Sequence, residues 1–129
     1  MNYTNKIISI FAMIIGLMAV VTGFGVLGGF YEPVYKYYLL LVSYNVIMGI
    51  ISIITSIFIW VQKNNALVFS SLIAGAHFVV LILLLSFFDL MISDQSKGAM
   101  TFRFTVWLII SLILWRIKKK DTYGIKIDQ

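Results

Sequence analysis

Three polar side chains are conspicuous in this sequence because each falls within a long apolar stretch. Asn45, His77 and Arg103 supply an amide, a titratable imidazole and a guanidinium. Ionisable residues at membrane depth are costly, so they commonly mark ligand sites or polar paths. We therefore predict a ligand-binding pocket in the outer half of a helical bundle, with His77 at its floor. Asn45, Arg103 and Ser52, which shares a helix face with Asn45, would line it.

Each of these residues also has an interpretation that needs no ligand. Asn45 could make an interhelical hydrogen bond, which contributes about 0.6 kcal/mol in membranes. His77 could be a neutral imidazole bonded to Asn45 or to a serine. Arg103 could extend outward to the membrane interface, because helical side chains point toward the N-terminus of their helix. A guanidinium that turned inward would instead suit an anionic headgroup or a carboxylate ligand.

Several kinds of chemistry are excluded by what the sequence lacks. There is no cysteine, which excludes disulfide exchange, thiolate catalysis and cysteine-bound metals. No paired carboxylates, catalytic triad or metal-ligand cluster can be recognised, and no basic–aromatic surface for nucleic acid. No cofactor is therefore predicted. The alternative is haem held by His77 with a methionine such as Met48 opposite, although one histidine without cysteine offers few ligands.

The segments that carry these residues are long and apolar. Of the 129 residues, 61% are hydrophobic and only 12% are charged, whereas soluble domains carry about 25% charged residues. Three charge-free gaps of about 25 residues exceed the roughly 20 that cross a hydrocarbon core. We predict an all-α integral membrane protein, a single four-helix transmembrane bundle over residues 1–129. The expected helices are approximately 7–27, 38–61, 66–88 and 98–117.

The first and fourth predicted helices each leave a question open. The uncharged run Phe104–Trp115 is only about 18 Å long, so the fourth helix must start near Gly98 and take Arg103 into the membrane. The first could be a cleaved signal peptide, but its apolar run is long for one and no small-residue cleavage site follows it. The longest loop is expected at Asp89–Lys97, where an aspartate could pair with Arg103 or Lys97.

Lysine and arginine predict the orientation, because they concentrate in cytoplasmic loops. One side of the predicted bundle receives Lys6, Lys63, Arg116, Lys118, Lys119, Lys120 and Lys126. The other side receives Lys36, Lys97 and Arg103. Both termini are therefore expected in the cytoplasm, with the chain crossing the cell membrane, such as a bacterial inner membrane, four times. The juxtamembrane group Arg116, Lys118, Lys119 and Lys120 is predicted to contact lipid headgroups.

Two stripes of small residues predict how the first two helices pack. The first consists of Ser9, Ala12, Gly16, Ala19 and Gly23, and the second of Asn45, Gly49, Ser52 and Ser56. Small residues at this spacing let two helix backbones approach closely in a bilayer. Gly16, Ala19, Gly23 and Gly49 are therefore expected at helix–helix contacts.

These features favour a non-catalytic membrane module: an accessory subunit, an immunity-type protein, or a binder of a small ligand or lipid. The alternative is a homo-oligomeric channel or transporter whose polar path includes Asn45, His77 and Arg103. A third hypothesis is a membrane enzyme or haem protein that uses His77. The expected partners are the lipid bilayer and other membrane subunits or further copies of the chain, and not nucleic acid.

Overall fold

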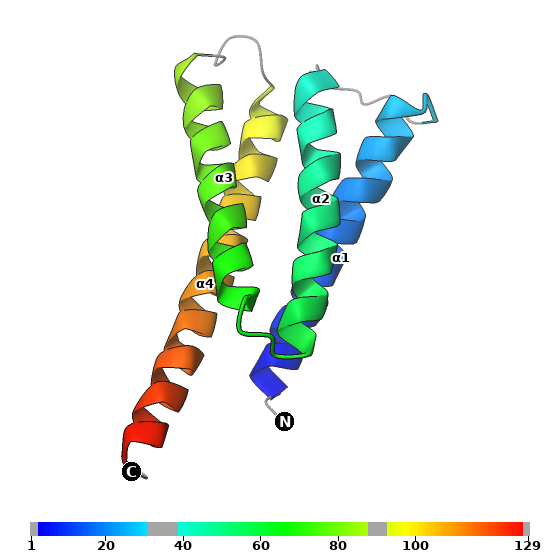
Figure 1. Ribbon diagram of the computed structural model, residues 1–129. Helices are drawn as coiled ribbons and strands as arrows, with labels where there is room; N and C mark the ends of the chain where they lie inside the picture. The colour runs from blue at the N-terminus through cyan, green and yellow to red at the C-terminus, as the bar shows by residue number, and fades with distance from the viewer. Residues whose placement is uncertain (1–2, 31–38, 88–92, 128–129) are drawn as a thin grey trace.

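Four antiparallel α-helices make up the regular structure in the described part of the chain. The computed structural model describes residues 3–30, 39–87 and 93–127. The helices are α1 (Tyr3–Leu27), α2 (Leu39–Trp60), α3 (Ala66–Ser86) and α4 (Asp94–Ile127) (Figure 1). Each contains a stretch long and apolar enough to cross a membrane. Even α3, the shortest at 21 residues, is about 32 Å long, against a hydrocarbon core of about 30 Å.

The observed bounds of α1, α2 and α3 differ from the expected ones by four residues or fewer. α1 begins at Tyr3, four residues before the expected start at 7, and ends as predicted. α2 fits the expected 38–61 to within one residue at each end over the residues described, and α3 ends at Ser86 rather than 88. Hydropathy therefore located these three helices, because the charges that limit them are sharply placed.

The bounds predicted for α4 are wrong at both ends, since the helix runs over Asp94–Ile127 instead of 98–117. Ser93 explains the early start, because its hydroxyl oxygen accepts a hydrogen bond from the Ser96 amide at 3.2 Å and so caps the helix. Asp94 therefore lies in the first turn of α4, where its carboxylate is 3.7 Å from Lys97 Nζ. The expected loop partner Asp89 lies outside the described residues. At the C-terminal end, charged residues lower the hydropathy, so the predicted span stops at 117. Lysine is nevertheless a good helix former in water, so the helix continues.

α1 and α2 end in the same kind of backbone motif. At the end of α1, Gly29 has a φ of 76°, the Phe30 amide donates to the Gly25 carbonyl and the Gly29 amide to that of Val26. This is a Schellman motif, and glycine suits its left-handed position. α2 repeats the pattern with Gln62 at φ 56°. A left-handed residue other than glycine is strained by roughly 1–2 kcal/mol, so the turn into α3 is made against the local preference of its sequence.

The small-residue stripe of α1 lies against α2. Ser9, Ala12, Gly16, Ala19 and Gly23 are all buried. A Cβ atom added to Gly16 would lie 2.9 Å from the Gly49 carbonyl oxygen, and one added to Gly49 would lie 3.0 Å from that of Gly16. The Ser9 hydroxyl donates to the Ser56 carbonyl at 2.7 Å. The α1–α2 contact thus combines close backbone approach with an interhelical hydrogen bond.

The four helices form two hairpins that pack less closely on each other. Contacts are most extensive between α1 and α2 and next between α3 and α4, whereas α2 meets α3 over a smaller area and α1 hardly meets α4 (Figure 1). Where the hairpins meet, the core is centred on Trp107, Ile73 and Ile59, each of which is at most 1% exposed. The interface between the two hairpins is therefore less closely packed than the interface within either hairpin.

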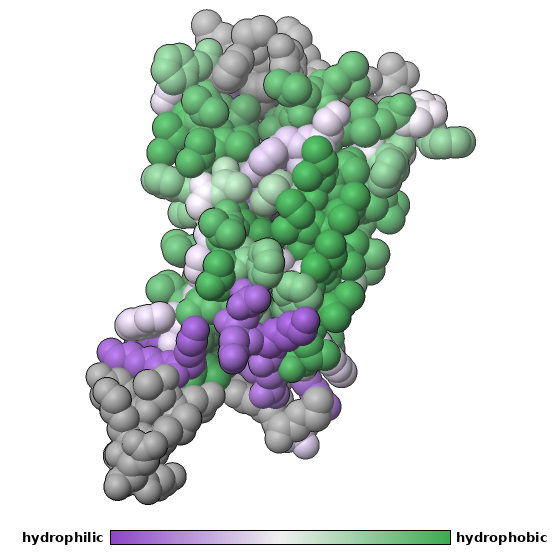
Figure 2. Space-filling model, viewed as in Figure 1, coloured by the Kyte–Doolittle hydropathy of each residue, from purple (hydrophilic) through white to green (hydrophobic). Residues whose placement is uncertain are grey.

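The outer surface is strongly apolar over most of its height. Figure 2 shows hydrophobic residues covering the view, with hydrophilic residues gathered at its lower end. Large aliphatic and aromatic side chains on all four helices are more than 40% exposed, among them Met18, Leu40, Leu72 and Phe102. Such a surface matches a lipid environment and would be unusual for a monomer in water.

Candidate functional site

A small cavity lies where the two hairpins meet. Its volume is about 10 Å³, enough for about one water-sized molecule. The cavity is lined by Ile15, Ala19, Asn45, Met48, Gly49, Ser52, His77, Arg103 and Trp107. The structure thus brings together all four residues predicted to form a pocket, from α2, α3 and α4. Their role in binding a ligand stays a prediction.

His77 is 2% exposed and makes its hydrogen bond to Tyr44. The Tyr44 hydroxyl oxygen lies 3.1 Å from His77 Nδ1, and the two rings meet edge to face at a centroid distance of 5.8 Å. In a neutral imidazole protonated at Nε2, the hydroxyl donates to Nδ1. The expectation that a structural His77 would bond to Asn45 or a serine is therefore wrong. The tyrosine side chain thus links α2 to α3.

Arg103 lies deeper along its helix than the predicted start of α4 implied. It comes nine residues after Asp94, which is about 14 Å of helix, rather than five residues after Gly98. His77 is likewise nine residues from Ser86, the end of α3 near the start of α4 (Figure 1). Arg103 is half-buried and lines the cavity. Its position beside His77 favours the inward orientation over extension to the interface.

Two lining residues present complementary polar atoms without partners in the described part of the chain. Asn45 Oδ1 is an acceptor and Trp107 Nε1 is a donor, and both atoms are buried. Burial of an unsatisfied polar group costs about 1–3 kcal/mol. Ser52 differs, because its hydroxyl donates to the Met48 carbonyl of its own helix at 2.7 Å. Asn45 Oδ1 therefore requires a donor, and Trp107 Nε1 requires an acceptor.

The packing around His77 does not fit a haem group. Met48, the methionine considered as a second axial ligand, lines the same cavity. However, that cavity has a volume of about 10 Å³, and His77 Nδ1 is already bonded to Tyr44. A porphyrin cannot enter without separation of the hairpins. Among the residues that the structure describes, no group of three or more His, Asp or Glu side chains could hold a metal ion.

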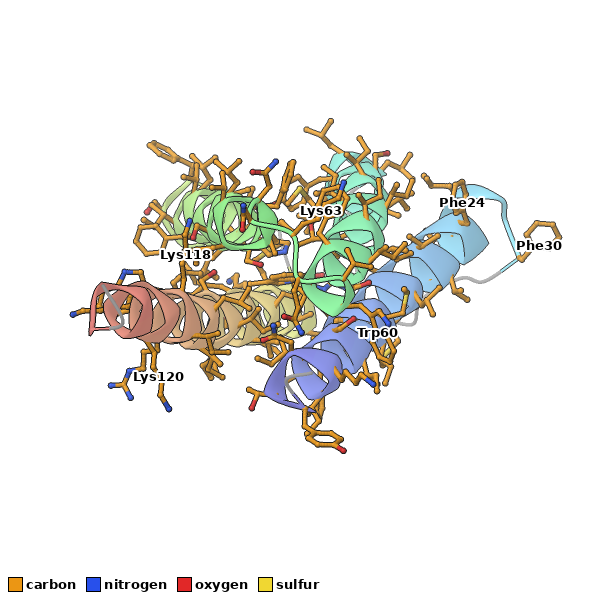
Figure 3. All side chains as sticks on the ribbon, turned by 60° about the horizontal axis from the view of Figure 1, so that its bottom comes forward. Phe24, Phe30, Trp60, Lys63, Lys118 and Lys120 are labelled. Atoms are coloured by element: carbon orange, nitrogen blue, oxygen red, sulfur yellow. The ribbon has the colours of Figure 1, made fainter. Side chains whose placement is uncertain are left out.

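Basic side chains gather at one end of the bundle. Lys63, Lys118 and Lys120 lie at the same end as Trp60, whereas Phe24 and Phe30 lie at the far end (Figure 3). Three lysines sit over aromatic rings, at centroid distances of 5.3 Å for Lys6–Trp60, 4.9 Å for Lys63–Phe58 and 5.0 Å for Lys119–Trp115. These distances are within the range of cation–π attraction. Lys36 lies outside the described residues.

Sequence reasoning missed two residues of this site, Tyr44 and Trp107. Tyr44 precedes Met48 and Ser52 at helical spacing, so its place on the buried face of α2 could have been recognised. Trp107 follows Arg103 by four residues, and its complete burial places both on one face of α4. Both were overlooked because aromatic residues with a polar atom are common at membrane interfaces as well.

Comparisons with known proteins provide no relative with which to interpret this arrangement. No protein-family model matches the chain, and neither a curated protein nor a solved structure resembles it.

Proposed function

We propose that this chain is a multi-pass protein of the cell membrane with both termini in the cytoplasm. Four apolar helices and a strongly apolar outer surface support insertion. The gathering of Lys63, Lys118 and Lys120 at one end, with Lys6 beside Trp60 at that end, supports the orientation, since basic residues favour the cytoplasmic side.

Reporter fusions test this orientation. A reporter fused after Gln129 should report the cytoplasm, and one inserted between Asp94 and Lys97 should report the opposite side. The physical reason is the excess of basic residues at the first end. Fusion of the same reporters to a chain with Lys63, Lys118 and Lys119 changed to Gln provides the comparison, because a weakened bias should mix the two orientations. Two wild-type fusions that report the same side would rule out the single span, α4, that is expected between them.

Within the membrane, we propose that the chain acts by binding and not by catalysis, as an accessory subunit or small binding module. The observation that carries this proposal is the small size of the cavity between the hairpins. The cavity gathers Asn45, His77 and Arg103, but its volume of about 10 Å³ leaves no room for an organic substrate. Such a small cavity suits a protein that holds helices in register, and its partners would be the bilayer and other membrane subunits or copies of itself.

A channel or transporter is the second candidate. The feature in its favour is that polar side chains of three helices, α2, α3 and α4, meet at one cavity near the middle of the bundle. Such residues inside membranes often line ion or proton paths. This function requires the hairpins to separate enough for the cavity to open toward both ends.

Flux and complex formation can be measured on the same purified protein. We expect proteoliposomes containing the chain to pass protons and small ions no faster than empty liposomes, because the cavity holds only about one water-sized molecule. On native gels, the protein from its own cells should migrate in a stable complex with another membrane protein. Flux that disappears in both the Arg103→Ala and the His77→Ala variant would favour the transporter and overturn the proposal.

A further inference from the structure

A second, larger hollow lies on the outer face of the α3–α4 hairpin. This groove has a volume of about 480 Å³, and its walls are mostly apolar. Gly75 leaves its wall open, because a Cβ atom added there would meet nothing within 4 Å. Ser71, one turn earlier on the same exposed face, also lines the groove. It is separate from the polar cavity, with which it shares none of its lining residues.

The groove runs along one half of the hairpin. At the basic end it is bounded by Leu67 and Trp115, and at the other end by Phe78 and Phe104, whose rings are 5.2 Å apart. On each helix these limits are eleven residues apart, which is about 17 Å. One leaflet is half of a hydrocarbon core of about 30 Å, or roughly 15 Å. The groove therefore has the length of one leaflet and begins at the end where the lysines lie.

The length and the apolar lining of the groove suit a hydrocarbon chain. The lining residues are mainly aliphatic and aromatic, and a length of about 17 Å matches the depth of one leaflet. A single acyl chain can therefore lie along the groove with its polar end at the basic end.

Positive charge surrounds the basic end of the groove. Trp115 is half-exposed there, with Lys119 Nζ 5.0 Å from the centre of its ring. Arg116, Lys118 and Lys120 follow on the same helix and are exposed. Figure 3 shows Lys118 and Lys120 at this end of α4. Guanidinium and ammonium groups bind phosphate oxygens through charge-assisted hydrogen bonds. Juxtamembrane basic clusters of this kind attract anionic lipids.

We propose that the α3–α4 groove is a binding site for an anionic phospholipid of the cytoplasmic leaflet. One acyl chain lies in the groove between Trp115 and the Phe78–Phe104 pair, and the phosphate contacts Arg116 and Lys118–Lys120. This inference rests on the proposed insertion and orientation of the chain. It goes beyond the proposed insertion and orientation because it names the class of ligand and its binding site.

Native mass spectrometry of the purified protein in mild detergent tests the site. We expect phosphatidylglycerol to bind more tightly than phosphatidylcholine with the same acyl chains. Gly75→Leu should weaken phosphatidylglycerol binding roughly tenfold, because the new side chain displaces about two methylene groups' worth of lipid contact. Gly98→Leu is the matched control, since a Cβ atom there also meets nothing within 4 Å but Gly98 is not part of the groove. It should leave binding unchanged.

Further variants separate the chain contact from the headgroup contact. Ser71→Phe provides a second obstruction should Gly75→Leu fold poorly. The combined Lys118→Gln and Lys119→Gln variant should bring phosphatidylglycerol binding down to that of phosphatidylcholine without blocking either lipid. Unchanged phosphatidylglycerol binding in both groove variants would overturn the proposal. So would loss of a dimer in those variants, which would make the groove an interface between copies. The reporter fusions judge orientation independently, so a failure there is distinguishable from failure of the lipid site.

Discussion

Gly16→Leu is expected to disrupt the α1–α2 pair and to lower the free energy of unfolding by about 3 kcal/mol, the upper end for overpacking. A Cβ atom at Gly16 would lie 2.9 Å from the Gly49 carbonyl oxygen and 3.1 Å from the Ile53 amide nitrogen. Both are backbone atoms, so a change of rotamer cannot relieve the clash. The helices must move apart, which also lengthens the Ser9–Ser56 hydrogen bond. Thermal or denaturant-induced unfolding in detergent micelles measures the loss.

The control for this prediction is Gly98→Leu, because the space around Gly98 is open. That substitution introduces the same side chain into a helix without a clash and replaces a poor helix former with a good one. We expect it to leave stability unchanged or slightly raised. Equal stability of Gly16→Leu and Gly98→Leu would mean that the α1 stripe does not pack on α2.

His77→Ala is expected to destabilise the protein by about 2–3 kcal/mol, through loss of packing and through a Tyr44 hydroxyl left without its partner. His77 is 2% exposed and its Nδ1 is 3.1 Å from the Tyr44 hydroxyl oxygen. Tyr44→Phe should cost less, about 1 kcal/mol, because it removes one hydrogen bond and little volume. The double variant should be more stable than the sum of the two effects predicts, since it leaves no orphaned hydroxyl.

The coupling energy between the two substitutions measures the interaction itself. Hydrogen bonds between membrane helices average about 0.6 kcal/mol and reach about 1.7 kcal/mol. Ser43→Ala is a suitable control, because the Ser43 hydroxyl donates to the Leu39 carbonyl of its own helix, at 3.0 Å, on an exposed face. It should change stability little and show no coupling to His77→Ala. Strictly additive effects of Tyr44→Phe and His77→Ala would contradict the hydrogen bond.

Much of the fold follows from the sequence, because the spacing of charged residues limits where a membrane helix can begin and end. The stripe Ser9–Gly23 also identifies the buried face of α1, since small residues recur there at every third or fourth position. The extension of α4 to Ile127 is different. Beyond the hydrocarbon core, the helix propensity of the residues and helix capping decide where a helix ends, and hydropathy measures neither.

The site was only partly predictable, for a physical reason. Asn45, His77 and Arg103 are recognisable singly, since each is costly in lipid, and the cavity they share agrees with the expectation that they face one another. Which atoms meet depends on the distance and axial register of neighbouring helices. The Tyr44–His77 pair arises from the particular offset between α2 and α3, and no periodicity within either helix contains that offset. The α3–α4 groove likewise exists because Gly75 and Ser71 face outward between larger residues.

The unequal packing of the two hairpins has a consequence during biosynthesis. The tight α1–α2 pair is complete before the 62 residues from Ala66 to Ile127 have been made. At about 5–20 residues per second, their synthesis takes roughly 3 to 12 s. Until α3 and α4 have been made, Tyr44 lacks its partner His77, and Asn45 lacks the α3 and α4 side chains that line the cavity with it. Lipid cannot satisfy these groups, so in nascent α2 they must contact water, the insertion machinery or a chaperone during that interval.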